Sequence, residues 1–211
     1  MDKSAQINTF NRYAQVSRET IISLNIFEKM LISANKQLNL IGKSTINNIW
    51  IRHFLDSAQV IDFVDKNDKT LVDLGSGAGF PGIVLAIMAK DKKIPLKVIL
   101  IEKSPKKINF LNEIVKKLKL NVSVRNQNIF NNQNKFPESI FVARAFKPLR
   151  IILELMHNKA KNLNKIIIFL GKTGQNELIQ ASKSWDIKYK QRISITSSDS
   201  CLIEINKIEK K

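Results

Sequence analysis

One short stretch constrains the fold of this chain more than any other: residues 70–82, with the sequence TLVDLGSGAGFPG. It begins as an apolar run, becomes a glycine-dense segment and leads into a second apolar run. Glycine tolerates positive φ and, because it lacks a Cβ, lets backbone N–H groups approach a ligand closely. Pro81 suits the first turn of a helix, where its missing N–H costs nothing. The stretch predicts a strand, a tight loop and a helix that together bind a nucleotide-type cofactor.

Beyond residue 70, short apolar runs alternate with amphipathic segments. The runs predict strands at residues 70–74, 97–102, 121–126, 139–144 and 165–170. The segments between them predict helices near residues 81–90, 104–119, 148–161 and 174–184. This alternation is typical of a parallel sheet that is covered by helices.

The last part of the chain follows a different pattern. Residues 185–196 and 200–208 read as two strands joined at residues 197–199, with no helix between them, which favours an antiparallel hairpin at the sheet edge. Five strands with helices and a closing hairpin are the layout of the class I methyltransferase fold. We therefore expect an α/β, Rossmann-like structure with a mostly parallel seven-stranded sheet. A dehydrogenase has no reason to end in such a hairpin.

The first 65 residues are predicted to be helical. Apolar side chains such as Ile21, Leu24 and Phe27 recur at helical spacing. We expect residues 1–65 to form an N-terminal helical extension and residues 66–211 to form a methyltransferase domain as one compact unit. The length of 211 residues suits one ordinary domain with such an addition.

The position of the acidic residues indicates which cofactor the loop binds. Gly77, Gly79 and Gly82 match G-x-G-x-x-G, which alone is a weak dinucleotide signal. However, Asp73 stands near the strand end, where it would repel a pyrophosphate but accept hydrogen bonds from an ammonium group, as in S-adenosylmethionine. Glu102 ends the next apolar run, at a suitable distance for binding ribose hydroxyls. The alternatives are a helix cap for Asp73 and a solvated strand end for Glu102.

Composition and charge suggest a partner and a compartment. The net charge of +17 and the pI near 10.0 favour RNA or DNA, although an AT-rich genome would also enrich lysine. Apolar runs are too short to span a membrane, and the N-terminus lacks a signal peptide, so we expect a cytoplasmic protein. Cys201 is the only cysteine, which excludes an internal disulfide or a cysteine-rich zinc site. We expect no metal.

Three motifs together resemble a known family. They are VDLGSGAGFPG at residues 72–82, Asn39-Leu40 followed by RHFLDS at residues 52–57, and ARAF at residues 143–146. They are similar to signatures of the glucose-inhibited division protein B family, the bacterial guanine-N7 methyltransferases of 16S rRNA. The resemblance covers nearly the whole chain. It implies S-adenosylmethionine as cofactor and 16S rRNA, or a precursor of the small ribosomal subunit, as partner.

The resemblance also implies site residues. The cofactor contacts it implies are Gly75, Phe80, Asn128, Ile129 and Arg144, which join Asp73, Gly77 and Glu102 as predicted cofactor-binding residues. These positions follow the carboxyl ends of predicted strands, where open α/β sheets bind ligands. Asn128 is equally consistent with a turn. Arg144 would bind either the methionine carboxylate or a substrate phosphate.

The predicted substrate-binding residues are Arg52, His53, Arg144 and Lys172. The alternatives are a surface ion pair between Arg52 and Asp56, four residues apart on one helix, and a packed histidine at His53. In the family a lysine at the position of Lys172 is often directly followed by glycine, whereas Thr173 intervenes here.

Absent motifs narrow the target atom. The chain contains no Pro-Pro, which exocyclic-amine methyltransferases commonly use, and Cys201 lacks the preceding proline of a cytosine-C5 nucleophile. A ring nitrogen such as guanine N7 needs neither device and no general base, so we assign no catalytic acid or base. Two alternatives remain at this point: a small-molecule methyltransferase and a non-catalytic RNA-binding module.

Overall fold

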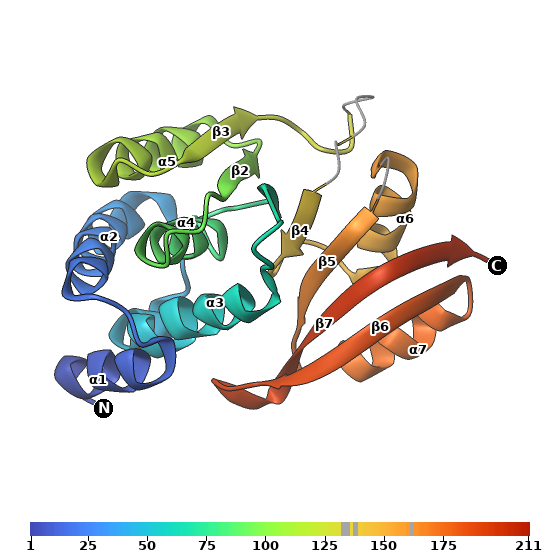
Figure 1. The fold of residues 1–211 in the computed structure, drawn as a ribbon, viewed down its shortest axis with the longest axis horizontal. Helices are drawn as coiled ribbons and strands as arrows, with labels where there is room; N and C mark the ends of the chain where they lie inside the picture. The colour runs from blue at the N-terminus through green and yellow to red at the C-terminus, as the bar shows by residue number, and fades with distance from the viewer. Residues whose placement is uncertain (132–135, 137–138, 161–162) are drawn as a thin grey trace.

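The computed structural model describes residues 1–131, 136, 139–160 and 163–211. Within these residues, seven strands form one sheet in the order β3-β2-β1-β4-β5-β7-β6 (Figure 1). The strands are β1 (Thr70–Leu74), β2 (Lys97–Glu102), β3 (Val122–Asn126), β4 (Ser139–Ala143), β5 (Leu163–Leu170), β6 (Trp185–Ser194) and β7 (Ser197–Lys210). Strands β1 to β5 pair in parallel, whereas β7 pairs antiparallel to both β5 and β6. The predicted mostly parallel sheet with a closing hairpin is confirmed.

The turn of the closing hairpin differs from the prediction. We expected it at residues 197–199, but residues 195–196 form the turn and residues 197–199 already belong to β7. The hydroxyl groups of Ser194 and Thr196 donate to Asp56 Oδ1, at 3.1 and 2.8 Å. The residues at the turn of the hairpin therefore contact a distant part of the chain, and the turn lies about two residues earlier than the local pattern predicts.

The four helices predicted between strands are all present. They are α4 (Gly82–Asp91), α5 (Pro105–Leu118), α6 (Leu149–Lys159) and α7 (Gly174–Ser182). Their ends agree with the prediction to within two residues, as is usual for helix boundaries. The last position of the helix predicted at 148–161 lies outside the described residues.

The N-terminal part is helical, as predicted. It contains α1 (Lys3–Ala14), α2 (Arg18–Leu38), the 3-10 helix η1 (Lys43–Asn48), the π-helix η2 (Trp50–Leu55), α3 (Asp56–Ala58) and the 3-10 helix η3 (Gln59–Phe63). Asp2 and Ser17 cap the first two helices by accepting hydrogen bonds from backbone N–H groups. Asn39 ends α2 in the left-handed conformation.

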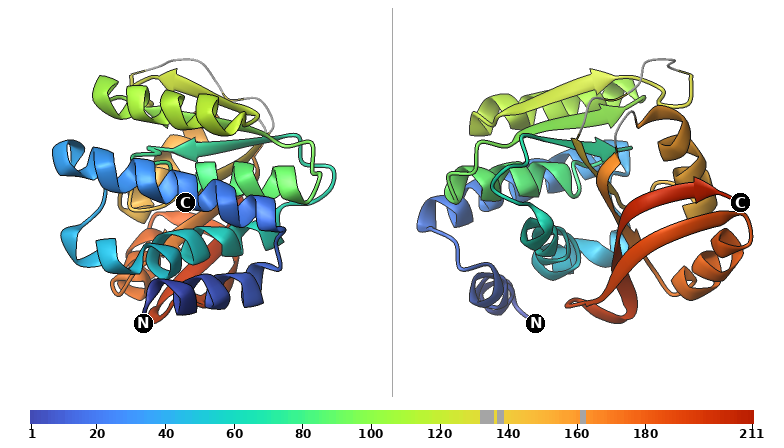
Figure 2. Two further views of the ribbon diagram at one scale, coloured as in Figure 1. Left: turned by 90° about the vertical axis from the view of Figure 1, so that its left-hand side faces the viewer. Right: turned by 45° about the vertical axis from the view of Figure 1, so that its right-hand side comes forward.

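The sheet has a hydrophobic core on each face. Because side chains alternate along a strand, Leu71 faces one core and Val72 the other. Figures 1 and 2 show α1 to α5 on one side of the sheet and α6 and α7 on the other. Phe27 of α2 stacks on Phe80 of the glycine loop, with ring centroids 5.3 Å apart, so the N-terminal helices share a core with the sheet. The division of the chain at residue 65 stays a prediction.

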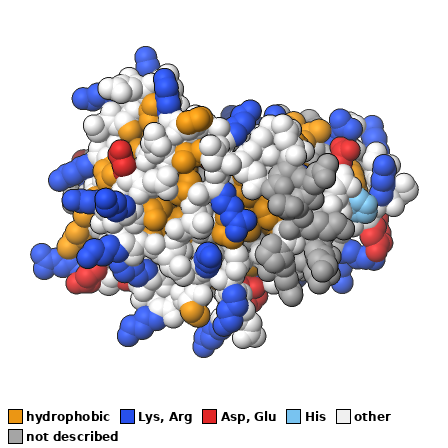
Figure 3. Space-filling view, turned by 90° about the horizontal axis from the view of Figure 1, so that it is seen from above, with side chains coloured by type: hydrophobic (Ala, Val, Ile, Leu, Met, Phe, Trp, Pro, Cys, Tyr) orange, Lys and Arg blue, Asp and Glu red, His pale blue; other side chains and the backbone are white. Residues whose placement is uncertain are grey.

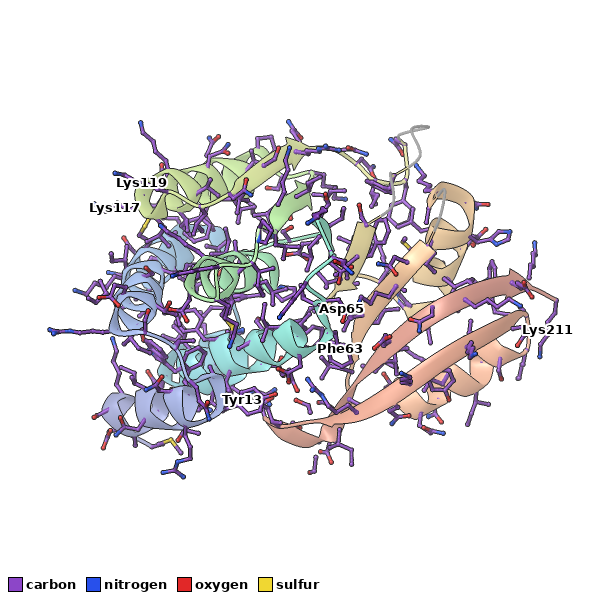
Figure 4. The ribbon with its side chains drawn as sticks, in the orientation of Figure 1. Tyr13, Phe63, Asp65, Lys117, Lys119 and Lys211 are labelled. Carbon is purple, nitrogen blue, oxygen red and sulfur yellow. The ribbon has the colours of Figure 1, made fainter. Side chains whose placement is uncertain are left out.

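A polar cluster also joins the N-terminal helices to the hairpin. Asp62 accepts hydrogen bonds from the hydroxyl of Tyr13 (2.7 Å) and from the guanidinium of Arg192 on β6 (2.9 Å). The same guanidinium lies 4.5 Å from the ring centroid of Phe63. Figure 4 labels Tyr13 and Phe63, which lie near the β6–β7 hairpin. Burial and the carboxylate of Asp62 raise the pKa of Tyr13 to about 12.

Candidate cofactor site

A cavity of about 600 Å³ opens at the carboxyl ends of β1 to β4. Open α/β sheets bind ligands at this end, where the strand order reverses, and the reversal here falls between β1 and β4. Most of the lining comes from the loops that follow these four strands. The lining residues are Leu40, Ile41, Gly42, His53, Gly75, Ser76, Gly77, Ala78, Phe80, Ile101, Glu102, Lys103, Lys107, Gln127, Asn128, Ile129, Phe130, Arg144, Ala145, Phe146 and Lys147.

Gly75 shapes the floor of this cavity. It directly follows β1 and has a φ of +72°, a conformation that side chains other than glycine rarely adopt. A Cβ at this position would come within 2.2 Å of the Phe146 ring. Glycine at residue 75 therefore lets the loop after β4 close over the loop after β1.

Glu102 holds the glycine loop from the neighbouring strand. One carboxylate oxygen accepts from the N–H of Gly77 at 3.0 Å, and the other accepts from the N–H groups of Lys103 and Ser104 at 2.8 and 2.9 Å. The side chain lines the cavity, as the predicted cofactor-binding role requires. Its contact with ribose hydroxyls stays a prediction.

Asp73 is not among the residues that line the cavity. It shares a sheet face with Leu71, on the side of α4, and is fully buried. Its Oδ2 accepts from the N–H of Gly82 at 2.9 Å, whereas its Oδ1 has no partner among the described residues. Burial raises the pKa of Asp73 to about 7, and the hydrogen bond from the Gly82 N–H opposes this shift. The helix-capping alternative matches this geometry, and a direct bond from Asp73 to an ammonium group stays a prediction.

The loop after β3 supplies an apolar and aromatic wall. Asn128 and Ile129 both line the cavity, but the side chain of Asn128 accepts from the N–H of Phe130 at 3.2 Å, which is the turn role that we considered. Ile129 is buried. Phe130 stacks on Phe146 with a centroid distance of 6.0 Å, and the ammonium of Lys147 lies 5.9 Å from the Phe130 ring centroid.

Arg144, directly after β4, connects the cavity to the N-terminal helices. Its guanidinium forms an ion pair with Asp56 at 2.9 Å and donates to the backbone oxygen of Arg52 at 2.6 Å. It also lies 5.8 Å from the ring centroid of Phe80, within reach of a cation–π interaction. Burial lowers the pKa of Arg144, and the charge of Asp56 opposes that effect.

His53 lies beside Arg144 and lines the same cavity. Its ring stacks on Phe80 at a centroid distance of 4.9 Å. The Arg144 guanidinium can only donate, so His53 Nδ1, at 3.3 Å, must accept, and Nε2 then carries the proton toward the Thr45 hydroxyl at 2.9 Å. Burial, together with the charges of Arg144 and Arg52, lowers the pKa of His53 to about 3. The ring is packed and hydrogen-bonded, as the alternative role for His53 requires, and it also lines the cavity.

The other two predicted substrate-binding residues lie on the surface. Arg52 has an exposed side chain one residue before His53. The alternative role for Arg52 was an ion pair with Asp56, but the carboxylate of Asp56 pairs with Arg144. Lys172 follows β5, is highly exposed and pairs with Asp199 at 3.3 Å. It does not line the cavity. Contact of Arg52 or Lys172 with RNA stays a prediction.

Several lining residues were not predicted individually. Lys103 and Lys107 follow β2, Gln127 follows β3, and Phe146 and Lys147 follow β4. A signal for them exists in the sequence, because residues just beyond the carboxyl ends of parallel strands gather at one edge of the sheet.

Among the described residues, no group of three or more His, Cys, Asp and Glu side chains is placed to hold a metal ion. Nor does any described helix have the length and apolar character that a membrane span requires.

Comparison with solved structures identifies the fold. An S-adenosylmethionine-dependent methyltransferase from Aquifex aeolicus superimposes with a TM-score of 0.54 at 19% identity, over 82% of this chain and 97% of that one. TrmK of M. capricolum, solved with S-adenosyl-homocysteine, gives a TM-score of 0.50 at 20% identity, over 72% of this chain and 67% of that one. The fold is that of the class I S-adenosylmethionine-dependent methyltransferases.

Sequence comparison then gives the family. The family model of rRNA small subunit methyltransferase G (GidB) matches residues 20–203. The protein of that name from Pelagibacter ubique is 44% identical over 198 residues, which cover 93% of this chain and 92% of that protein. Its namesake from Rickettsia akari is 37% identical over 196 residues, covering 93% and 98%. The chain belongs to the rRNA small subunit methyltransferase G family.

Proposed function

We propose that this chain transfers a methyl group from S-adenosylmethionine to N7 of a guanine in 16S rRNA, in the cytoplasm. One observation carries the proposal: a glycine-loop cavity at the switch point of the sheet, in a chain whose match to the rRNA methyltransferase G family spans residues 20–203. Its relatives at 44% and 37% identity carry the same rRNA methyltransferase name over nearly their full lengths.

The cavity suits S-adenosylmethionine in size and chemistry. A volume of about 600 Å³ lies within the range of small-molecule sites. Ile101 and Ile129 provide apolar surface for an adenine ring, and the Glu102 carboxylate provides an acceptor for ribose hydroxyls. Phe80 and Phe146 provide aromatic faces, which attract a cation. When bound, S-adenosylmethionine supplies an electrophilic methyl group on its sulfonium.

The hydrogen bonds of two titratable side chains in the cavity support a nucleophile that attacks through a free lone pair and has no proton to lose. His53 has both ring nitrogens engaged, with Arg144 and Thr45. Glu102 uses both carboxylate oxygens to hold backbone N–H groups. Guanine N7 bears no proton, so the reaction needs no base, and the protein contributes by orienting the reactants and by excluding water.

The charge of the chain supports an RNA substrate. The net charge is +17, and Lys103, Lys107 and Lys147 line the cavity itself. Figure 3 shows Lys and Arg side chains spread over the face that is seen from above in Figure 1, with fewer acidic ones. Lys117 and Lys119, labelled in Figure 4, extend the basic surface at the end of α5. Phosphate neutralisation by such side chains gives salt-dependent binding.

The test is to incubate the purified chain with unmethylated small ribosomal subunits or 16S rRNA and labelled S-adenosylmethionine, and to map N7-methylguanine by mass spectrometry. We expect one modified guanine. If calorimetry detects no binding of the cofactor, the chain is a non-catalytic RNA-binding module. If the cofactor binds and methyl transfer occurs only to a metabolite, the chain is a small-molecule methyltransferase.

A further inference from the structure

A second cavity, of about 330 Å³, lies beside the first at the carboxyl ends of β4 and β5. Three residues, Ala145, Phe146 and Lys147, line both cavities. A molecule in the second cavity is therefore separated from the candidate cofactor site by one short loop. Its volume is close to the lower end of the range for small-molecule sites, which suits a single nucleobase.

Glu177 of α7 provides a carboxylate in this second cavity. One oxygen accepts from the N–H of Leu149, the first residue of α6, at 2.8 Å. The other accepts from the hydroxyl of Thr173 at 3.1 Å. These two bonds fix the orientation of the carboxylate. A carboxylate has about four acceptor positions, so each oxygen keeps capacity for one more donor.

The second cavity also contains aromatic surface. Phe146 and Phe169 both line the second cavity, and both are partly exposed. Aromatic faces of this kind stack unpaired bases in RNA-binding proteins, while hydrogen bonds to the base edges give specificity. The second cavity thus combines two aromatic side chains with the two acceptor oxygens of one carboxylate that is held by hydrogen bonds.

We propose that the second cavity binds the acceptor guanine and that Glu177 is a specificity-determining residue; this inference rests on the function proposed above. Guanine presents two adjacent donors on its Watson–Crick edge, N1–H and the 2-amino group, which match the two oxygens of Glu177. Its N7 lies on the opposite side of the ring system and so is directed away from Glu177, toward the shared loop. Adenine has an acceptor at N1 and no 2-amino group, so the carboxylate rejects it.

The experiment replaces the modified guanosine, once mapped, with inosine, which keeps N7 but lacks the 2-amino group. For the full chain we expect kcat/KM to fall by about tenfold or more on inosine, because one charge-assisted hydrogen bond is lost. Glu177→Gln keeps an acceptor for the Leu149 N–H. We expect this variant to methylate both substrates with similar efficiency, near that of the wild type on inosine.

Glu154→Gln is the matched control, because Glu154 is an exposed acid on α6 and its substitution changes the net charge equally. This variant should keep the preference for guanosine. Calorimetry should give the Glu177→Gln variant an unchanged affinity for S-adenosylmethionine, since Glu177 does not line the first cavity. If Glu177→Gln does not fold, Glu177→Asp is used, which keeps the charge and withdraws it by one methylene, and it should lose the preference.

Two results overturn the inference: a wild type that methylates guanosine and inosine equally, or a Glu177 variant that keeps the full wild-type preference. Both leave the proposed function intact, because guanine is still methylated. A wild type that binds the cofactor but transfers no methyl to guanosine in RNA overturns the proposed function and this inference with it.

Discussion

The carboxylate of Asp56 forms an ion pair with the guanidinium of Arg144 at 2.9 Å, between the N-terminal helices and the end of β4. Both side chains are largely buried, with 12% and 17% of their surface exposed. The same carboxylate accepts hydrogen bonds from Gln59, Ser194 and Thr196. Asp56 thus connects three distant parts of the chain next to the candidate cofactor site.

We expect Asp56→Asn to lower the free energy of unfolding by about 3 kcal/mol, because it leaves the largely buried cation of Arg144 without its counter-ion. Urea denaturation measures this loss. The control is Asp62→Asn, since Asp62 pairs with Arg192 at an exposed site, with side-chain exposures of 47% and 35%. The control should cost about 1 kcal/mol or less. Equal losses for the two variants would contradict the special role of Asp56.

The depressed pKa of His53 predicts a pH dependence of stability. Burial lowers this pKa from 6.5 to about 3, so the unfolded state binds a proton more readily than the folded state between these values. The contribution of His53 to stability is therefore complete above pH 6.5 and is lost progressively as the pH falls toward 3. Between pH 7 and pH 5 it amounts to about 2 kcal/mol.

Urea denaturation at these two pH values measures the effect. Wild type should lose more stability on acidification than His53→Gln, whereas His157→Gln should behave like wild type, because His157 is exposed. Nitrogen NMR should find His53 neutral with the proton on Nε2. Titration of His53 near pH 6.5 would show that the ring is not held as described.

Gly75→Ala should severely weaken cofactor binding. The new Cβ would lie 2.2 Å from the Phe146 ring, at a φ of +72°. Such strain costs about 1–3 kcal/mol, either in stability or in displacement of the loop after β4. Calorimetry with S-adenosylmethionine and thermal unfolding give the two readouts. Gly171→Ala is the steric control, because a Cβ there meets nothing within 4 Å, and its cofactor affinity should match that of wild type.

Asp73→Ala should weaken cofactor affinity by about tenfold or more. The variant removes the acceptor for the Gly82 N–H, which positions the start of α4 and the glycine loop. Lys172→Ala should change the affinity by less than about twofold, because Lys172 is 83% exposed and lies outside the cavity. Calorimetry measures both, and equal effects would count against the assignment of the site.

Local sequence patterns were sufficient for the fold and for the position of the glycine loop that lines the candidate site. Apolar runs marked the strands, and residues 75–82 marked the loop at the end of β1. The alternation of side chains along β1 would also have placed Asp73 with Leu71, facing α4 rather than the cavity. The signal for this placement therefore exists in the sequence, whereas the direct contact of Asp73 with an ammonium group stays a prediction.

Other features depend on contacts between distant residues, which no local pattern contains. Asp56 and Ser194 are 138 positions apart, yet their hydrogen bond accompanies the shift of the hairpin turn. The pairing of Arg144 with His53 joins residues 91 positions apart and determines the tautomer of the histidine. Such partners become evident only once the N-terminal helices are packed against the sheet.

The strand order has a consequence for how this protein folds while the ribosome synthesises it. Strand β6 leaves the exit tunnel before β7, yet its partner in the described sheet is β7, which lies between it and β5. Until β7 emerges, β6 lacks the strand with which it pairs. Until then β5 also has an unpaired edge, which is a site where another chain can pair. Completion of the sheet therefore requires β7, and a chain that is arrested before residue 197 would keep this edge of β5 unpaired.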